Sequence, residues 1–91
     1  MMYIVAYDIT DNRRRSRLFK AIKGFGTWSQ FSIFECDLNK TQVGQLQRTI
    51  QKIVETSEDS VKIYPLCLSC LDGAEIIGIG RIARKPEIII V

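Results

Sequence analysis

The sequence predicts an α+β fold of the ferredoxin-like type, βαββαβ with an extra C-terminal strand, in which two helices cover one face of an antiparallel sheet. Three observations lead to this prediction. The 91 residues suffice for one domain, residues 1–91, and no linker, repeat or low-complexity tract divides them. Two segments place apolar side chains at the three-to-four-residue spacing of a helix. Short runs rich in β-branched and aromatic residues flank those segments and predict strands.

The first half of the chain is expected to form a strand, a helix and a second strand. Residues 2–9 are apolar and rich in strand-forming side chains, with Asp8 near their end. Polar residues 10–12 can cap a helix that runs to about Phe25, where flanking glycines end it. Residues 28–37 are typical of a second strand. The helix has an apolar stripe of Leu18, Phe19, Ile22 and Phe25, and a basic stripe of Arg13, Arg17 and Lys20.

The second half is expected to add one helix and three strands. Asn39 or Thr41 can cap the helix, and residues 67–73 are expected to be a connection. The buried stripe of this helix would consist of Val43, Leu46, Ile50, Ile53 and Val54. The three strands are expected at residues 61–66, 75–80 and 87–91.

Both faces of the sheet are predicted to be apolar. In the first strand Ile4 and Ala6 point to one face, whereas Tyr3, Val5 and Tyr7 point to the other. In the second strand Phe34 and Cys36 would share one face, and Phe31 and Ile33 the other. A sheet with one solvated face would instead alternate apolar with polar residues. We therefore expect a homodimer that covers the open face, with the terminal strand added to a sheet edge.

The charge and composition limit the possible chemistry. Histidine is absent, which excludes histidine-based nucleophile systems, a histidine general base and imidazole zinc ligands. Six basic residues lie between residues 11 and 23 against one acid: Arg13, Arg14, Arg15, Arg17, Lys20 and Lys23. Such a concentration of positive charge favours a polyanion, most often nucleic acid, although a solvated helix face is the alternative.

The cysteines and the hydropathy suggest an ordinary soluble domain. Cys67 and Cys70 have the spacing of half a zinc site, but no second pair and no histidine completes it. Cys36 lies in an apolar run, and we expect structural roles for all three cysteines. No apolar run approaches the roughly 18 residues of a membrane span, and no leader is recognised, so we expect a cytoplasmic protein.

Asp8 is the candidate reactive group, because a carboxylate at the end of an apolar strand is costly unless it meets a cation, a metal or hydrogen-bond donors. It could cap the following helix or pair with an arginine. Arg15 lies on the inward edge of that helix and should point toward the end of the first strand. The pair could be a salt bridge, or a phosphate-holding group beside a metal-holding one.

Several motifs in order along the chain resemble the CRISPR-associated adaptation endonuclease family. They are Tyr7-Asp8-Ile9 at the end of the first strand, the arginine-rich helix, QFSIFEC at residues 30–36, YPLCLSC at residues 64–70 and IGIG at residues 77–80. The likeness covers essentially the whole chain. It implies a ferredoxin-like homodimer, a Mg²⁺-dependent endonuclease acting on RNA or DNA in antiviral defence, and association with the CRISPR integrase.

The resemblance also implies site residues, by matching positions. Asp8 matches a metal-binding, catalytic aspartate, and Arg15 and Arg17 match arginines near the scissile phosphate. The positions matched or expected to contact nucleic acid are Tyr7, Arg13, Arg14, Lys20, Ser32 and Phe34. Trp28 departs from the family pattern, which usually has a basic residue there; it could stack on a base or pack in a core or interface.

Two functions stay open from the sequence, because the arginine cluster argues against a third, a small-molecule-binding regulatory domain of the same fold. The first is a metal-dependent phosphodiesterase in which Asp8 side chains from two protomers share one Mg²⁺. The second is a non-catalytic dimeric scaffold that grips duplex DNA for the integrase through its basic helices.

Overall fold

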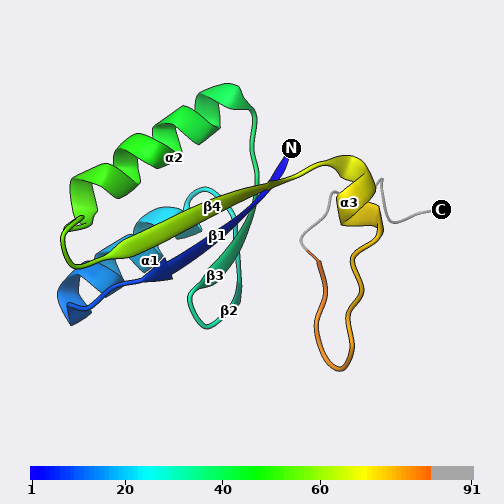
Figure 1. Ribbon diagram of the computed structural model, residues 1–91, viewed down its shortest axis with the longest axis horizontal. Coiled ribbons are helices and arrows are strands. Elements are labelled where there is room, and N and C mark those ends of the chain that lie inside the picture. Colours follow the sequence, from blue (N-terminus) through cyan, green and yellow to red (C-terminus); the bar gives the residue numbers. More distant parts are fainter. Residues whose placement is uncertain (83–91) are drawn as a thin grey trace.

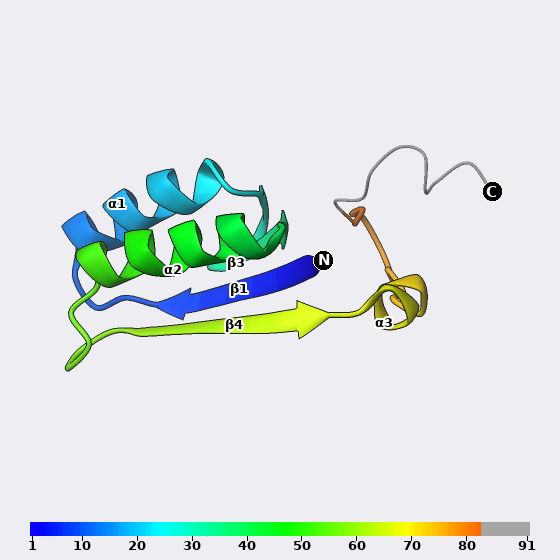
Figure 2. The same cartoon turned by 90° about the horizontal axis from the view of Figure 1, so that it is seen from above.

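The computed structural model describes residues 1–82 and contains a four-stranded antiparallel sheet with two helices on one face (Figures 1 and 2). The strand order is β2-β3-β1-β4, so β1 lies in the interior between β3 and β4. The elements in chain order are β1 (Met2–Asp8), α1 (Asn12–Lys23), β2 (Thr27–Gln30), β3 (Ile33–Asp37), α2 (Lys40–Ile53), β4 (Ser60–Leu66) and α3 (Leu68–Asp72). The predicted α+β class and βαββαβ order are confirmed.

The two long helices begin and pack as predicted. The Asp11 carboxylate accepts a hydrogen bond from the Arg14 backbone N–H at the start of α1, and Asn39 forms a capping box with Gln42 at the start of α2. Both helices press their apolar stripes on the sheet. The core between them contains Val5, Tyr7, Ile9, Leu18, Ile22, Phe34, Cys36, Leu38, Leu46 and Ile50.

The expected single strand at residues 28–37 is wrong, because the chain forms a hairpin there. β2 and β3 pair in antiparallel fashion with a register shift between Trp28 and Gln30. At the turn, Phe31 has φ 45°, and the Trp28 indole N–H donates to the Phe31 carbonyl at 2.8 Å. The turn contains no glycine, proline or asparagine, so the usual sequence signals of a hairpin are missing. This hairpin supplies the two adjacent strands of the βαββαβ order.

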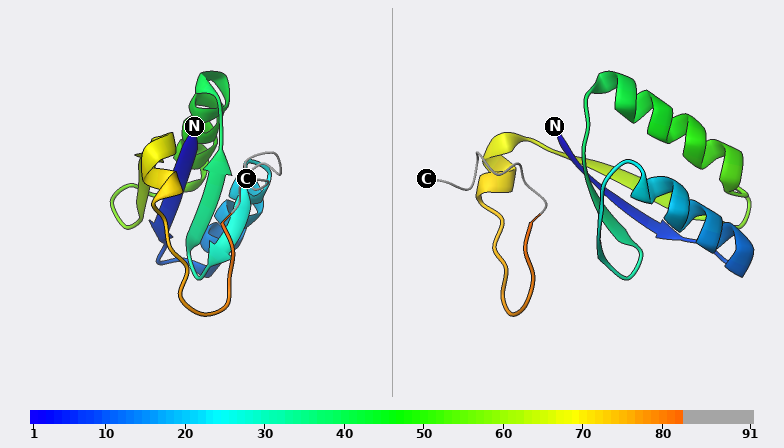
Figure 3. Two further views of the ribbon diagram at one scale, coloured as in Figure 1. Left: turned by 90° about the vertical axis from the view of Figure 1, so that its right-hand side faces the viewer. Right: turned by 180° about the vertical axis from the view of Figure 1, so that it is seen from behind.

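The C-terminal part also differs from expectation. Residues 75–80 form no strand in the structure, and residues 68–72, within the expected connection, form the short helix α3. Gly78 adopts φ 97°, which interrupts extended backbone, and Ile77 and Ile79 are fully exposed. α3 and the segment after it project beyond the end of the sheet (Figures 1 and 3). The terminal strand expected at residues 87–91 lies outside the described residues.

The second face of the sheet carries no element among residues 1–82. The register pairs Ile4 with Tyr64 and Ala6 with Ile33, which places these apolar side chains on the face opposite the helices. Tyr64 is half exposed. The prediction that both faces are apolar is thus confirmed for β1, although Phe31 lies in the hairpin turn rather than on this face. Within the described part of the chain, no helix has the length and apolarity needed to cross a bilayer.

Candidate functional site

Asp8 ends β1 with an exposed side chain. Its neighbours Tyr7 and Ile9 belong to the core, so alternation directs Asp8 to the open face of the sheet, opposite Ser60 of β4. The helix cap is Asp11, so the expectation that Asp8 could cap the helix is wrong. Among residues 1–82, no hydrogen bond or ion pair engages its carboxylate. Asp8 therefore presents an uncompensated negative charge at the surface.

The β2–β3 turn lies beside this strand end. The Tyr7 backbone N–H donates to the Ser32 carbonyl at 3.1 Å, and the Tyr7 ring stacks on Phe34 at a centroid distance of 6.4 Å. Burial raises the pKa of Tyr7, while a hydrogen bond with the Ser32 side chain and the charge of Arg15 partly oppose the rise. Tyr7, Ser32 and Arg15 thus lie around the end of β1, while the Asp8 side chain projects to the open face of the sheet.

Arg15 points toward the end of β1, as predicted. One guanidinium nitrogen donates to the Ile9 carbonyl at 2.8 Å, and another donates to the Asn12 side-chain oxygen. A salt bridge with Asp8, one of the two alternatives left open by the sequence, is absent among residues 1–82. Asn12 was not expected to hold this arginine, and its place in the first helical turn is the only sequence signal for that role. These contacts hold a positive charge at the strand end while Arg15 stays exposed.

Arg14, by contrast, is engaged within the chain. Its Nε donates to Asp59 at 2.8 Å, and its Nη2 lies 3.3 Å from Glu58. The Asp59 side chain is completely shielded from solvent, and the Arg14 guanidinium holds the pKa of this carboxyl well below its usual range. The Thr10 backbone N–H also donates to Asp59 at 3.1 Å. This cluster fixes the start of α1 to the loop before β4, so Arg14 is not available to a phosphate in this arrangement.

The remaining basic side chains of α1 face solvent. Arg13, Arg17 and Lys20 are exposed, as predicted, and Lys23 lies 5.8 Å from the centre of the Phe19 ring. The Trp28 ring packs edge-on against Phe19 at 6.2 Å and remains half exposed. α1 therefore provides an exposed basic face, and its side chains Arg13, Arg17 and Lys20 form no ion pairs with the described residues.

Phe34 corrects one expectation of nucleic-acid contact. Its side chain is completely buried and touches the rings of both Tyr7 and Phe19. It offers no surface to a ligand. Its place in the core follows from the register, which pairs Phe34 with Val5 on the helix-covered face.

The cysteines separate into two environments. Cys36 is buried, and burial raises the pKa of its thiol to about 11, consistent with a core role. Cys67, at the N-cap of α3, and Cys70, in the middle of this helix, are exposed free thiols. A hydrogen bond with the Ser69 hydroxyl lowers the pKa of Cys67 to about 7, and the pKa of Cys70 is raised by the adjacent Cys67.

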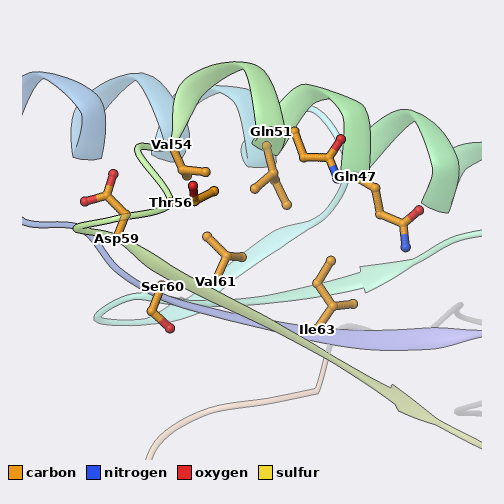
Figure 4. A pocket seen from close by; sticks show the side chains of 9 residues that line it. Gln47, Gln51, Val54, Thr56, Asp59, Ser60, Val61 and Ile63 are labelled. Atoms are coloured by element: carbon orange, nitrogen blue, oxygen red, sulfur yellow. The ribbon is translucent and has the colours of Figure 1, made fainter.

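A cleft of about 380 Å³ lies between α2 and β4, on the helix-covered side (Figure 4). Its lining residues are Gln47, Ile50, Gln51, Val54, Thr56, Asp59, Ser60, Val61 and Ile63. Asp59 is the charged side chain of this set, and it already pairs with Arg14. Because the lining contains no basic residue, the cleft does not suit a phosphodiester.

The Asp8 carboxylate can supply one ligand to a hard divalent cation. A free carboxylate is the ligand type that Mg²⁺ prefers, and Mg²⁺ commonly binds through one or two carboxylates with water and phosphate oxygens. Within residues 1–82, no three His, Cys, Asp or Glu side chains gather at one point. One chain therefore brings one carboxylate, and further ligands must come from water, nucleic acid or a second chain.

Comparison with known proteins identifies relatives along the whole chain. The family model for CRISPR associated protein Cas2 matches residues 1–73. The chain is 38% identical to CRISPR-associated endoribonuclease Cas2 3 of Synechocystis over 90 residues, covering 99% of this chain and 98% of the relative. It is 32% identical to CRISPR-associated endonuclease Cas2 2 of Thermus thermophilus over 87 residues, covering 96% and 92%.

Two solved structures have the same fold as this chain. A crystal structure of the hypothetical protein TT1823 from Thermus thermophilus superposes with a TM-score of 0.79 at 33% identity, covering 91% of this chain and 96% of that one. Streptococcus pyogenes Cas2 at pH 6.5 superposes with a TM-score of 0.76 at 24% identity, covering 86% and 100%.

Proposed function

Because this chain belongs to the Cas2 family of CRISPR-associated proteins, we propose that it is an endonuclease that hydrolyses phosphodiester bonds in RNA or DNA with Mg²⁺ held at Asp8. The observation that supports this most directly is the exposed Asp8 carboxylate, which lacks a partner among residues 1–82 and stands at the strand end toward which Arg15 also turns. The names of the relatives, endoribonuclease and endonuclease, support the reaction class. A role in spacer acquisition with the CRISPR integrase, in the cytoplasm, rests on the family alone.

Asp8 and the basic side chains of α1 have different roles in the proposed reaction. When bound, Mg²⁺ supplies Lewis-acid polarisation of a phosphoryl oxygen and a more acidic water, which replaces the histidine base that the chain lacks. Asp8 would hold the ion through its carboxylate. Arg15 at the end of β1 and Arg17 on the exposed face of α1 would neutralise negative charge that grows in the transition state. Arg13 and Lys20 add affinity by releasing counterions from the nucleic acid.

The proposal includes a homodimer, because one carboxylate per chain is a weak magnesium site. Ile4, Ala6, Ile33 and Tyr64 form an apolar patch on the open sheet face, interrupted by Lys62 and Glu35. A second copy that covers this patch would remove apolar surface from water, and Asp8 lies on the same open face of the sheet as the patch. Ile77 and Ile79 add exposed apolar surface in the segment after α3.

Sedimentation tests the dimer. We expect a mass twice the 10.4 kDa of one chain at micromolar concentration. Tyr64→Glu should shift the protein to monomer, because it introduces a charge into the apolar patch, whereas Gln45→Glu on the exposed side of α2 should leave the dimer intact. A well-behaved monomer of the unmodified protein would contradict both the dimer and the shared Mg²⁺ site.

Removal of the metal tests the reaction. We expect cleavage of RNA or duplex DNA in Mg²⁺ and none after chelation, while affinity for the same nucleic acid persists because it rests on the basic face of α1. Cleavage that survives chelation would contradict the metal site. Tight binding without cleavage at any divalent metal would instead favour the second candidate function, a dimeric scaffold for duplex DNA, which the exposed Arg13, Arg17 and Lys20 support.

A further inference from the structure

The β2–β3 turn exposes an aromatic side chain that the fold does not use. Phe31 is 86% exposed, and no ring contact within residues 1–82 involves it. Its backbone adopts φ 45°, a left-handed conformation that is unfavourable for a bulky residue and more common for asparagine. The exposed phenylalanine and the strained backbone both lower the stability of the fold. Because the core gains nothing from this side chain, we look for its role in binding a ligand.

The neighbouring residues hold this turn in place. The Trp28 indole N–H donates to the Phe31 carbonyl at 2.8 Å, and Trp28 itself packs against Phe19. On the other side, the Ser32 carbonyl accepts the Tyr7 N–H at 3.1 Å. The backbone of the turn is thus fixed from both sides, while the Phe31 ring projects into solvent. A ring presented in this way is preorganised for a flat ligand.

The position of the turn relative to Asp8 follows from one backbone contact. The Tyr7 N–H donates to the Ser32 carbonyl at 3.1 Å, so the turn that carries Phe31 lies beside the end of β1, where Asp8 stands. Arg15, on the neighbouring helix, is close enough to Tyr7 to influence its pKa. An aromatic face, a cation and a candidate metal-binding carboxylate therefore gather at one end of the sheet.

We propose that Phe31 stacks on an unpaired nucleobase and so positions the adjoining phosphate at Asp8. This rests on the proposed function and adds to it a residue that would bind the substrate, through a base that is unpaired in a single strand or displaced from a duplex. Aromatic side chains stack on any exposed base, whereas bases inside a duplex have both faces covered by their neighbours. The basic face of α1 would bind the phosphates on one side of the stacked nucleotide.

The test measures binding in the presence of a chelator, so that it does not depend on cleavage. Single-stranded oligonucleotides, DNA and RNA in separate arms, are titrated with the unmodified protein, Phe31→Asn and Phe31→Tyr. Asparagine tolerates the left-handed backbone, so the fold and its melting temperature should persist. We expect Phe31→Asn to weaken single-strand binding by about 5- to 100-fold and Phe31→Tyr to change it little. Leu68→Asn, at an exposed apolar position on α3, serves as the matched control.

Two further arms separate stacking from general affinity. An oligonucleotide with abasic sites should bind the unmodified protein as weakly as the intact one binds Phe31→Asn, and duplex binding should be equal in all variants. Unchanged single-strand binding by Phe31→Asn, or an equal loss for duplex, would overturn the proposal, as would a shift of Phe31→Asn to monomer, which would assign the ring to a protein interface. Loss of cleavage in Asp8→Asn with normal stacking would support the proposed function separately, and cleavage that persists there would contradict that function but not the stacking.

Discussion

We expect Asp8→Asn to lower the rate of Mg²⁺-dependent cleavage on the order of 100-fold or more, because the amide removes the charge that holds the ion and its activated water. The affinity for nucleic acid, measured without metal, should be equal or higher, since one negative charge near the phosphates is gone. The fold should be unaffected, because no described residue bonds to the Asp8 carboxylate. Single-turnover cleavage and salt-titrated binding on one substrate measure both quantities.

A matched control separates this effect from a general change of charge. Glu75→Gln removes a negative charge from an exposed side chain in the segment after α3, distant in sequence from β1, and should cleave at the normal rate. Undiminished cleavage by Asp8→Asn would contradict the role of Asp8 as metal ligand. A large fall in the melting temperature of Asp8→Asn would show that the carboxylate has a structural role instead.

The second large effect concerns Phe34, which the family resemblance placed at the nucleic acid and the structure places in the core. Phe34→Ala should lower the free energy of unfolding by about 3–5 kcal/mol, because it empties a fully buried site between Tyr7, Phe19 and Val5. A domain of this size has a total of about 5–15 kcal/mol, so the loss is a large part of it. Urea denaturation followed by circular dichroism measures the change.

Phe34→Leu is the informative companion variant. It keeps most of the apolar volume and should destabilise the chain by less than Phe34→Ala, with nucleic-acid affinity per folded molecule unchanged in both. A stable Phe34→Ala protein with weakened binding would show that the side chain does reach the nucleic acid, and would restore the role that the resemblance implied.

Much of the fold follows from short-range patterns. The caps Asp11 and Asn39 start the two long helices because side-chain oxygens there satisfy free backbone N–H groups, which is a local effect. The apolar stripes of α1 and α2, and the alternation in β1, determine which side chains meet in the core. The position of Asp8 at a strand end, next to a basic helix, was also readable from the sequence alone.

Other features depend on contacts between distant residues. The turn at Phe31 exists because the Trp28 indole and the Tyr7 backbone hold it, although its residues lack hairpin signals. Residues 75–80 have strand-forming composition, but a strand also requires a partner edge, and composition says nothing about one.

The arginines of α1 show what the sequence determines and what depends on the tertiary structure. The sequence determined that α1 is basic on one face and that Arg15 turns toward the strand end, because helical periodicity sets the direction of each side chain. Only the tertiary structure decided that Arg14 pairs with Glu58 and Asp59 across more than forty residues, and that Asp8 stays without a partner among the described residues. Ion pairs form between groups that the backbone brings within a few ångströms, and that proximity is a property of the packed chain.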